Sequence, residues 1–163
     1  MSFQFEIMEK ADRESILPAL FCLLNANMSE IAPTGNTYEE DFRQWKAAVY
    51  PALDRPERQI IIIRDEGALA GYFQYYVNSD TFMMEEIQFE RRYWGTGLFK
   101  QLYEYLARLI PSHIQYAEAY SHKLNLKSQQ ILRHLGLEIT GENKNGNSYH
   151  FRGDCQSMLS RYR

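Results

Sequence analysis

Hydrophobic and polar residues alternate in several stretches of the chain, which is the pattern of β-strands with one buried face. FQFEIM (Phe3–Met8) and HIQYAEAYSH (His113–His122) alternate most regularly. RQIIIIRDEGALAGYFQYYV holds two runs of β-branched and aromatic residues, which predict a hairpin that turns at Asp65–Gly67. A further strand is predicted for TFMMEEIQF (Thr81–Phe89), and a last hairpin is expected to turn in the region Asn143–Asn147.

Two helices are predicted between the first strand and the first hairpin. In SILPALFCLLNAN the apolar residues share one helical face, with Ser15 expected as the N-cap and Pro18 in the first turn. In TGNTYEEDFRQWKAAVYPAL, Thr37 and Glu40 have the spacing of a capping box. Apolar residues then recur on one stripe until Pro51, so this segment is predicted as the second helix.

Two more helices are predicted in the second half of the chain. One begins at Leu98 and must end near Pro111, and the other, NLKSQQILRHLG, has Asn125 near its start and Gly136 at its C′ position. The resulting order β, α, α, β, β, β, α, β, α, β, β predicts an α+β fold (an α/β three-layer arrangement) with a mixed central sheet and helices on both faces. The crossover within Phe82–His122 is expected to join two parallel strands in the right-handed sense.

The composition places limits on size and partners. The chain has 163 residues, enough for one full hydrophobic core, so we predict a single domain over residues 1–163. Hydrophobic residues make up 45% and charged residues 24% of the chain, which argues against disorder. The net charge of -3 gives no basic field, so neither nucleic acid nor a membrane surface is expected as a partner.

Cysteine content and the N-terminal residues bear on location. Cys22 and Cys155 are too few for a disulfide framework or a thiolate metal cluster. The N-terminal MSFQFEIMEKADRES has acidic residues where a signal peptide has an apolar core, and no apolar run approaches the length of a membrane span. A cytoplasmic protein without a metal is therefore expected.

Two glycines, Gly95 and Gly97, stand directly before the helix that begins at Leu98. A helix N-terminus has unpartnered N–H groups and a partial positive charge, so it attracts a phosphate, and glycine lets that phosphate approach the backbone. Arg92 would add a positive charge. The alternative is that the glycines only make a tight turn. The lysine and hydroxyl of a nucleoside-triphosphate loop do not follow Gly97, and a dinucleotide fold has its glycines after the first strand.

At these residues the sequence resembles the GNAT superfamily of acyl-CoA-dependent N-acetyltransferases. That family has [RQ]-x-x-G-x-[GA] between its fourth strand and third helix, which RYWGTG (Arg92–Gly97) matches. A second family pattern, N-x-x-[AS]-x-x-x-Y-x-x-x-G-[FL], is matched by NLKSQQILRHLGL at Asn125, Ser128, Gly136 and Leu137. The order of elements agrees over nearly the whole chain.

The resemblance implies a sheet of about seven strands in which the parallel strands 4 and 5 splay apart to admit pantetheine, as free strand N–H and C=O groups need partners. Acetyl-CoA is implied as co-substrate, with its diphosphate on the glycine turn, and an amine as acceptor. GNAT-like domains often form homodimers, and the sequence leaves the oligomeric state open. The cofactor-binding residues expected are Ile87, Gln88, Phe89, Arg92, Tyr93, Trp94, Gly95, Thr96, Gly97, Leu98, Asn125 and Ser128. Asn125 is equally suited to capping its helix.

Acetyl transfer requires a neutral amine, so a base must remove a proton, and a backbone N–H can polarise the thioester carbonyl. Glu85 and Glu86 lie on the fourth strand and are expected on opposite faces, so at most one should face the acceptor. The tyrosine that often protonates the leaving thiolate in this family is replaced by Leu132. Tyr120, His122 and Tyr149, in the second half of the sheet, are the candidates for a proton donor in its place.

Acceptor specificity is expected from the second helix and the first hairpin. An aromatic and acidic lining there would suit a cationic amine, and its members would be Tyr38, Trp45, Tyr72, Tyr75, Tyr76, Glu39, Glu40 and Asp41. The leading hypothesis is an N-acetyltransferase that moves acetyl from acetyl-CoA to an amine, in a small molecule or a peptide, by direct transfer in a ternary complex. Because of Leu132, a catalytically silent CoA-binding sensor or interaction module is kept as the alternative. A different phosphate-bearing ligand is a third.

Overall fold

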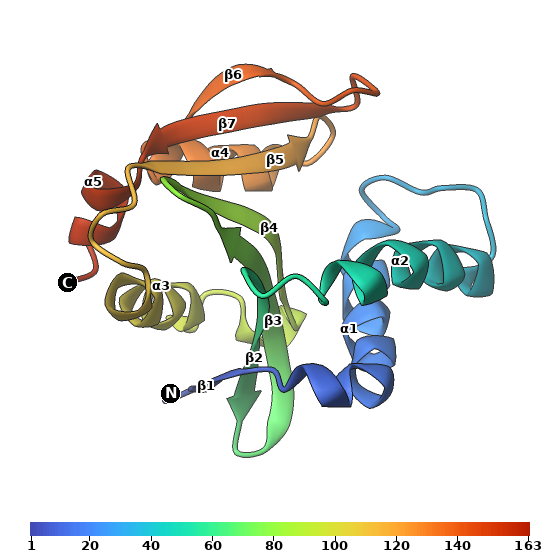
Figure 1. Ribbon diagram of the computed structural model, residues 1–163. Coiled ribbons are helices and arrows are strands. Elements are labelled where there is room, and N and C mark those ends of the chain that lie inside the picture. The colour runs from blue at the N-terminus through green and yellow to red at the C-terminus, as the bar shows by residue number, and fades with distance from the viewer.

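The computed structural model describes residues 1–163 and shows one mixed sheet with helices on both sides (Figure 1). Its elements in chain order are β1 (Gln4–Ile7), the 3₁₀ turn η1 (Lys10–Asp12), α1 (Arg13–Met28), α2 (Tyr38–Ala52), β2 (Arg58–Asp65), β3 (Ala68–Val77), β4 (Thr81–Phe89), the 3₁₀ turn η2 (Arg91–Tyr93), α3 (Leu98–Leu109), β5 (Tyr116–His122), α4 (Leu126–His134), β6 (Glu138–Glu142), β7 (Ser148–Asp154) and α5 (Cys155–Ser160).

The seven strands are arranged in the order β1-β2-β3-β4-β5-β7-β6. Neighbours pair antiparallel except β4 and β5, which are parallel and joined through α3. The predicted mixed sheet and its parallel crossover are therefore confirmed. Both hairpin turns also lie where the sequence indicated, after Asp65 and after Glu142.

The sheet has a buried core on each face, and four consecutive isoleucines show how. Ile60 and Ile62 belong to a cluster with Leu20 of α1 and Val49 of α2, whereas Ile61 and Ile63 belong to a larger cluster with residues of α3, α4 and α5. Successive strand residues point to opposite faces, so this continuous apolar run serves both layers. We call the two sides the α1 face and the α3 face.

The predicted capping residues are found at α2 and α4 but not at α1. Thr37 and Glu40 form both halves of a capping box at α2, and Gly136 (φ 94°) takes the left-handed conformation that ends α4. The predicted N-cap Ser15 is wrong. Helix α1 begins at Arg13 after Asp12, and the Ser15 hydroxyl instead donates to the Asp12 carbonyl oxygen. Pro18 therefore lies in the helix and not in its first turn.

The C-terminal helix α5 was not predicted. Asp154 ends β7 and accepts a hydrogen bond from the Ser157 backbone N–H at 2.7 Å, which caps the helix. Buried Met158 and Leu159 then pack into the α3-face core. None of the helices combines the length and apolar character that a membrane span requires, and no group of three or more His, Cys, Asp or Glu residues is placed to hold a metal ion.

Candidate functional site

The parallel strands β4 and β5 pair along only part of their length. Register pairs run from Thr81↔Tyr116 to Met84↔Ala119 and stop there, although β4 continues to Phe89 and β5 to His122. We call the unpaired remainder, Glu85–Phe89 and Tyr120–His122, the fork. The expected splay of the two strands is thus present, and it exposes one backbone edge of β4.

A cavity of about 890 Å³ occupies the fork and extends to α1, α3 and α4. Its volume lies in the range of small-molecule and cofactor sites. The predicted site residues that line it are Glu85, Glu86, Ile87, Gln88, Phe89, Tyr93, Trp94, Gly95, Gly97, Leu98, Tyr120, His122, Asn125 and Ser128. Of the predicted cofactor-binding residues, only Arg92 and Thr96 do not line it. The fold therefore gathers both sequence motifs and the β4 glutamates around one space.

The glycine turn presents free backbone amides to this cavity. Gly95 (φ 75°) and Gly97 (φ 88°) both have the left-handed conformation that favours glycine, and a Cβ on either would meet no atom within 4 Å. Backbone N–H groups without any acceptor cluster here, at Gly95, Gly97, Leu98, Phe99 and Lys100. The Thr96 N–H is not among them, because it donates to the Tyr93 carbonyl oxygen. An anion at the start of α3 would satisfy several of these donors.

The positive charge at the turn comes from an unexpected residue. The Arg92 guanidinium lies 4.7 Å from the centroid of the Tyr93 ring, outside the cavity lining. Lys127 of α4 lines the cavity, and its Nζ lies 3.5 Å from the centroid of the Trp94 ring. Burial lowers the pKa of Lys127. Only its position two residues after Asn125 could have drawn attention to it in the sequence.

Asn125 has the capping role and keeps a free donor. Its Oδ1 accepts from the Ser128 backbone N–H at 3.1 Å, while its Nδ2 has only the Met28 sulfur as a weak partner at 3.9 Å. Since Asn125 and Ser128 both line the cavity, the cap and a contact to a bound molecule are compatible.

Helix α1 closes the other side of the fork. Nδ2 of the buried Asn27 lies 2.9 Å from two acceptors, Oε1 of Gln88 and the carbonyl oxygen of Phe89. The Phe89 carbonyl also accepts from the Trp94 indole N–H at 3.2 Å. These contacts provide donors for the carbonyl oxygen of Phe89, at the end of β4 that has no β5 partner. The sequence did not single out Asn27, since one polar residue on a helix carries no signal of its own.

The two β4 glutamates lie on the same face of the sheet, so the prediction that they point to opposite faces is wrong. Gln74 of β3 pairs with Glu86 but Tyr75 pairs with Met84, which leaves Glu85 as the extra residue of a β-bulge. The side chains of both glutamates therefore lie on the α1 face of the sheet. Glu85 Oε1 lies 2.6 Å from Arg58 Nε and 3.4 Å from Gln74 Nε2, and Glu86 Oε1 accepts from Gln88 Nε2 at 2.7 Å.

Their electrostatic surroundings differ. Glu85 is 23% exposed and tied to Arg58, whose guanidinium also lies over the Tyr76 ring. Glu86 has no cationic partner, and burial raises its pKa to about 7, against the opposing effect of the Gln88 hydrogen bond. A carboxylate with a pKa near neutrality can take up a proton at physiological pH, as a general base must.

The expected proton donors are spread over different environments. Tyr120 is 49% exposed and its ring centroid lies 4.8 Å from that of His150. His122 Nδ1 accepts from the Leu124 backbone N–H at 3.1 Å. Tyr149 is not among the residues that line the cavity, whereas Leu132 is, at 8% exposure. Tyr103 of α3, which the sequence did not suggest, lines it with its hydroxyl 3.3 Å from the Met84 sulfur.

The expected aromatic and acidic acceptor lining is not found at the cavity. None of its eight members, from α2 and the hairpin, lines the cavity. Tyr38 packs edge-on against Phe21, and Tyr72 lies in the α1-face core. Tyr38 and Trp45 lie on the apolar stripe of α2, which packs against α1, because apolar periodicity reports burial and not ligand contact.

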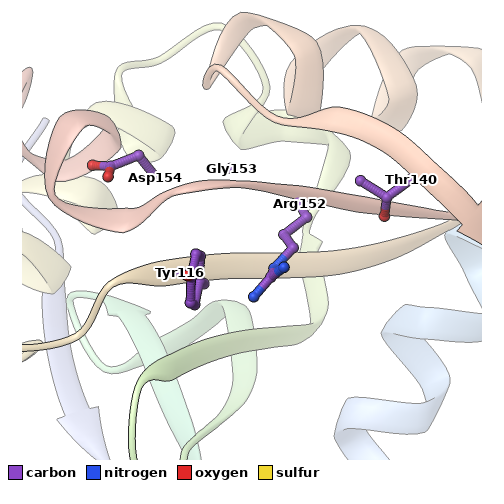
Figure 2. Close-up of a pocket in the computed structure, with 5 residues that line it drawn as sticks. All are labelled: Tyr116, Thr140, Arg152, Gly153 and Asp154. Atoms are coloured by element: carbon purple, nitrogen blue, oxygen red, sulfur yellow. The ribbon is translucent and has the colours of Figure 1, made fainter.

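A second, smaller pocket of about 250 Å³ is lined by residues of β5, β6 and β7 (Figure 2). Figure 2 shows Tyr116 and Arg152 side by side, and the Arg152 guanidinium lies 3.7 Å from the Tyr116 ring centroid. Asp154 is occupied by capping α5. The polar side chains of this pocket thus have partners within the protein, and no predicted site residue lines it.

Comparisons with known proteins agree with this geometry. The model of the Acetyltransferase (GNAT) family matches residues 17–137. No curated protein matches the sequence significantly.

Three solved structures illustrate the shared fold. The PaiA N-acetyltransferase from Thermoplasma acidophilum in complex with coenzyme A has a TM-score of 0.72 at 13% identity, covering 94% of this chain and 99% of that one. The aminoglycoside acetyltransferase AAC(6')-Ib in complex with coenzyme A and kanamycin has a TM-score of 0.67 at 18% identity, covering 99% and 100%. Mutant forms of the spermidine/spermine N-acetyltransferase SpeG from Vibrio cholerae have a TM-score of 0.64 at 14% identity, covering 99% and 98%.

At these identities the structural matches establish the fold alone, whereas the family match covers most of the chain. The chain therefore belongs to the GNAT family of acetyltransferases.

Proposed function

We propose that this protein is an N-acetyltransferase that moves the acetyl group of acetyl-CoA to an amine by direct transfer in a ternary complex. Residues 1–163 would act as one domain. The observation that carries the proposal is that the free amides of the glycine turn and the fork open onto the same cavity. An anionic head and a peptide-like tail on one molecule would satisfy both, and acetyl-CoA has both.

Binding would use the backbone more than side chains. The N–H groups from Gly95 to Lys100 would receive the diphosphate, with Lys127 as the nearby cation. The open edge of β4 at Ile87–Phe89 would pair with the pantetheine amides, as a further strand would. Trp94, Ser128 and the free Nδ2 of Asn125 would line the path between them.

Transfer would depend on Glu86. Acetyl-CoA supplies a thioester, whose carbonyl a β4 backbone N–H at the fork would polarise. Glu86 faces α1, has a pKa of about 7 and has no competing cation, so it would accept the proton of the attacking amine, directly or through one water. Glu85 is neutralised by Arg58 and would shape the site without taking the proton.

The acceptor would be a primary amine that enters from the α1 face. Two structurally similar enzymes are named for, or were solved with, compounds carrying several amines, spermidine/spermine and kanamycin. These compounds, together with peptides that have a free N-terminus, are therefore the first acceptors to test.

The experiment is a thiol-release assay with acetyl-CoA and that amine panel, preceded by calorimetry with CoA. We expect CoA to bind at micromolar concentrations and at least one amine to release thiol. Absence of CoA binding at high micromolar concentrations would contradict the whole proposal.

The alternative of a catalytically silent CoA-binding module rests on one observation. Leu132 lies in the cavity wall and has no proton to donate to the leaving sulfur. CoA binding without turnover of any amine would favour this module, and turnover that Glu86→Gln abolishes would exclude it.

A further inference from the structure

The cavity contains a buried hydroxyl group that no part of the protein engages. Ser121 of β5 is 4% exposed, and its Oγ is one of two buried side-chain atoms in the chain that have no hydrogen-bond partner. Ser121 also lines the cavity. Buried polar groups are nearly always paired, so an orphan next to a binding cavity indicates a partner that the protein alone does not supply.

The position of Ser121 relative to the fork is specific. The last register pair of the two parallel strands is Met84↔Ala119. Ser121 stands two residues past that pair on β5, and Glu86 stands two residues past it on β4. Because Glu85 is the extra residue of the β-bulge, Glu86 lies about one strand position past that pair, whereas Ser121 lies two positions past it. They therefore mark the two sides of the gap about one strand position apart.

The two residues serve opposite faces of the sheet. Ala117 and Ala119, which share the side of Ser121 along β5, belong to the core under α3 and α4. Glu86 is turned to the α1 face by the bulge at Glu85. A thioester held in the gap would thus have a base toward the entering amine and a hydroxyl toward the departing sulfur.

We propose that the Ser121 hydroxyl is the hydrogen-bond donor to the sulfur of CoA during transfer, in the role that Leu132 cannot fill. This inference rests on the proposed acetyl transfer. The amine nitrogen bonds to the carbonyl carbon, the C–S bond breaks with its electron pair on sulfur, and Glu86 takes the amine proton. Ser121 keeps its own proton and shares it with the thiolate, which is later protonated from solvent.

Other donors at the cavity are less suitable. No hydrogen bond holds the Ser121 side chain, so a change to another staggered rotamer that brings Oγ toward a ligand would break no hydrogen bond within the protein. Tyr103 already has the Met84 sulfur as a contact and its ring is stacked on Phe99, with centroids 4.5 Å apart. Tyr120 lies on the other face of β5, where its ring packs against that of His150.

The test compares Ser121→Ala, Ser121→Thr and the rival Tyr103→Phe. We expect Ser121→Ala to lower kcat about a hundredfold, with KM for acetyl-CoA and the CoA Kd within about threefold of the parent. Ser121→Thr keeps the hydroxyl and should retain kcat within about threefold, as should Tyr103→Phe. The melting temperature of Ser121→Ala without ligand should stay equal or rise, because an unpaired buried hydroxyl is removed.

A binding measurement separates this proposal from the proposed function. The parent protein should bind CoA more tightly than desulfo-CoA, which lacks the sulfur, and Ser121→Ala should lose that preference even if no amine is ever acetylated. The proposal is overturned if Ser121→Ala leaves kcat or the CoA preference unchanged, if it lowers the melting temperature as a structural serine would, or if Tyr103→Phe alone removes the activity.

Discussion

Strands β4 and β5 are neighbours in the sheet, but they are paired at one end and parted at the other. Over Thr81–Met84 and Tyr116–Ala119 they are paired, and the side chains there include the fully buried Phe82 and Ala117. Beyond Met84 the strands part, and the residues along the gap include two glutamates, Gln88 and an unpartnered serine. The paired segment, which we call the closed end, contributes stability through packing. The parted segment, the open end, leaves polar groups without partners in the protein, and such groups do not favour stability.

The β-bulge marks the boundary between these regions. A regular strand would place Glu86 on the α3 face together with Met84. The extra residue Glu85 turns it toward α1 instead. One inserted residue therefore changes which layer of the molecule receives the carboxylate. Substitutions at the two ends should accordingly have separable effects on rate and on stability.

The largest expected effect is on catalysis at the open end. Glu86→Gln removes the proposed base and should lower kcat about a thousandfold, within the range known for general bases. The parent rate should rise with pH through about 7, because only the ionised carboxylate accepts a proton, and Glu86→Gln should lose this limb. Steady-state kinetics between pH 5.5 and 8.5, a range set about that pKa, measure both effects.

Glu85→Gln is the matched control, since it changes the adjacent carboxylate in the same way. It disrupts a partly exposed ion pair with Arg58 and should lower kcat less than about tenfold. An equal loss in both variants would contradict the distinct roles given to the two glutamates.

At the closed end the expected effect is on folding. Phe82 is fully buried and packs against Phe73 and Tyr75. Phe82→Ala should lower the free energy of unfolding by about 3 to 5 kcal/mol. Denaturant unfolding measures this. CoA affinity of the folded protein should change little, and a selective loss of affinity without lost stability would break the distinction between the two ends.

Glu86 also predicts how stability changes with pH. Its pKa of about 7 lies above the ordinary 4.5, so the folded state binds more protons than the unfolded state between these values. The free energy of unfolding should therefore fall as pH rises through this window, by on the order of 3 kcal/mol from this residue. Glu86→Gln should be more stable than the parent at pH 8 and nearly equal at pH 4. If Glu86→Gln and the parent were equally stable at both pH values, burial would not raise the pKa of Glu86 as described.

The smallest effect is expected at the glycine turn. Gly97→Ala places a Cβ on a left-handed residue beside the free amides and should weaken CoA binding about tenfold. Gly35→Ala is a matched control, because Gly35 has φ 79° and an equally open surrounding but does not line the cavity. It should show a similar loss of stability and an unchanged CoA affinity in calorimetry. Equal losses of affinity in both variants would indicate a general effect of strain.

Features set by local chemistry were predictable from the sequence. The Thr37 capping box, the Gly136 helix end and the turn at Asp65–Gly67 each depend on residues a few positions apart. The glycine turn belongs to this class too, since its spacing directly before Leu98 indicated the free amides. The six-residue α5 is too short to show a helical period, so it gave no comparable signal.

Features set by strand pairing were not predictable. The bulge at Glu85 depends on how β3 aligns with β4, and alternation along β4 alone assigned the glutamates to the wrong faces. Ser121, Asn27 and Lys127 reach the cavity only because β5, α1 and α4 converge on it. Arg92 had the expected motif position, but its side chain lies over Tyr93.

The most direct test of the open fork is backbone amide NMR during titration with CoA. The amides of Gly95, Gly97, Leu98 and of Ile87–Phe89 should shift with CoA concentration, while those of Thr81–Met84 in the paired segment should move little. Shifts confined to the paired segment, or none at high micromolar CoA, would contradict a cofactor site between the parted strands.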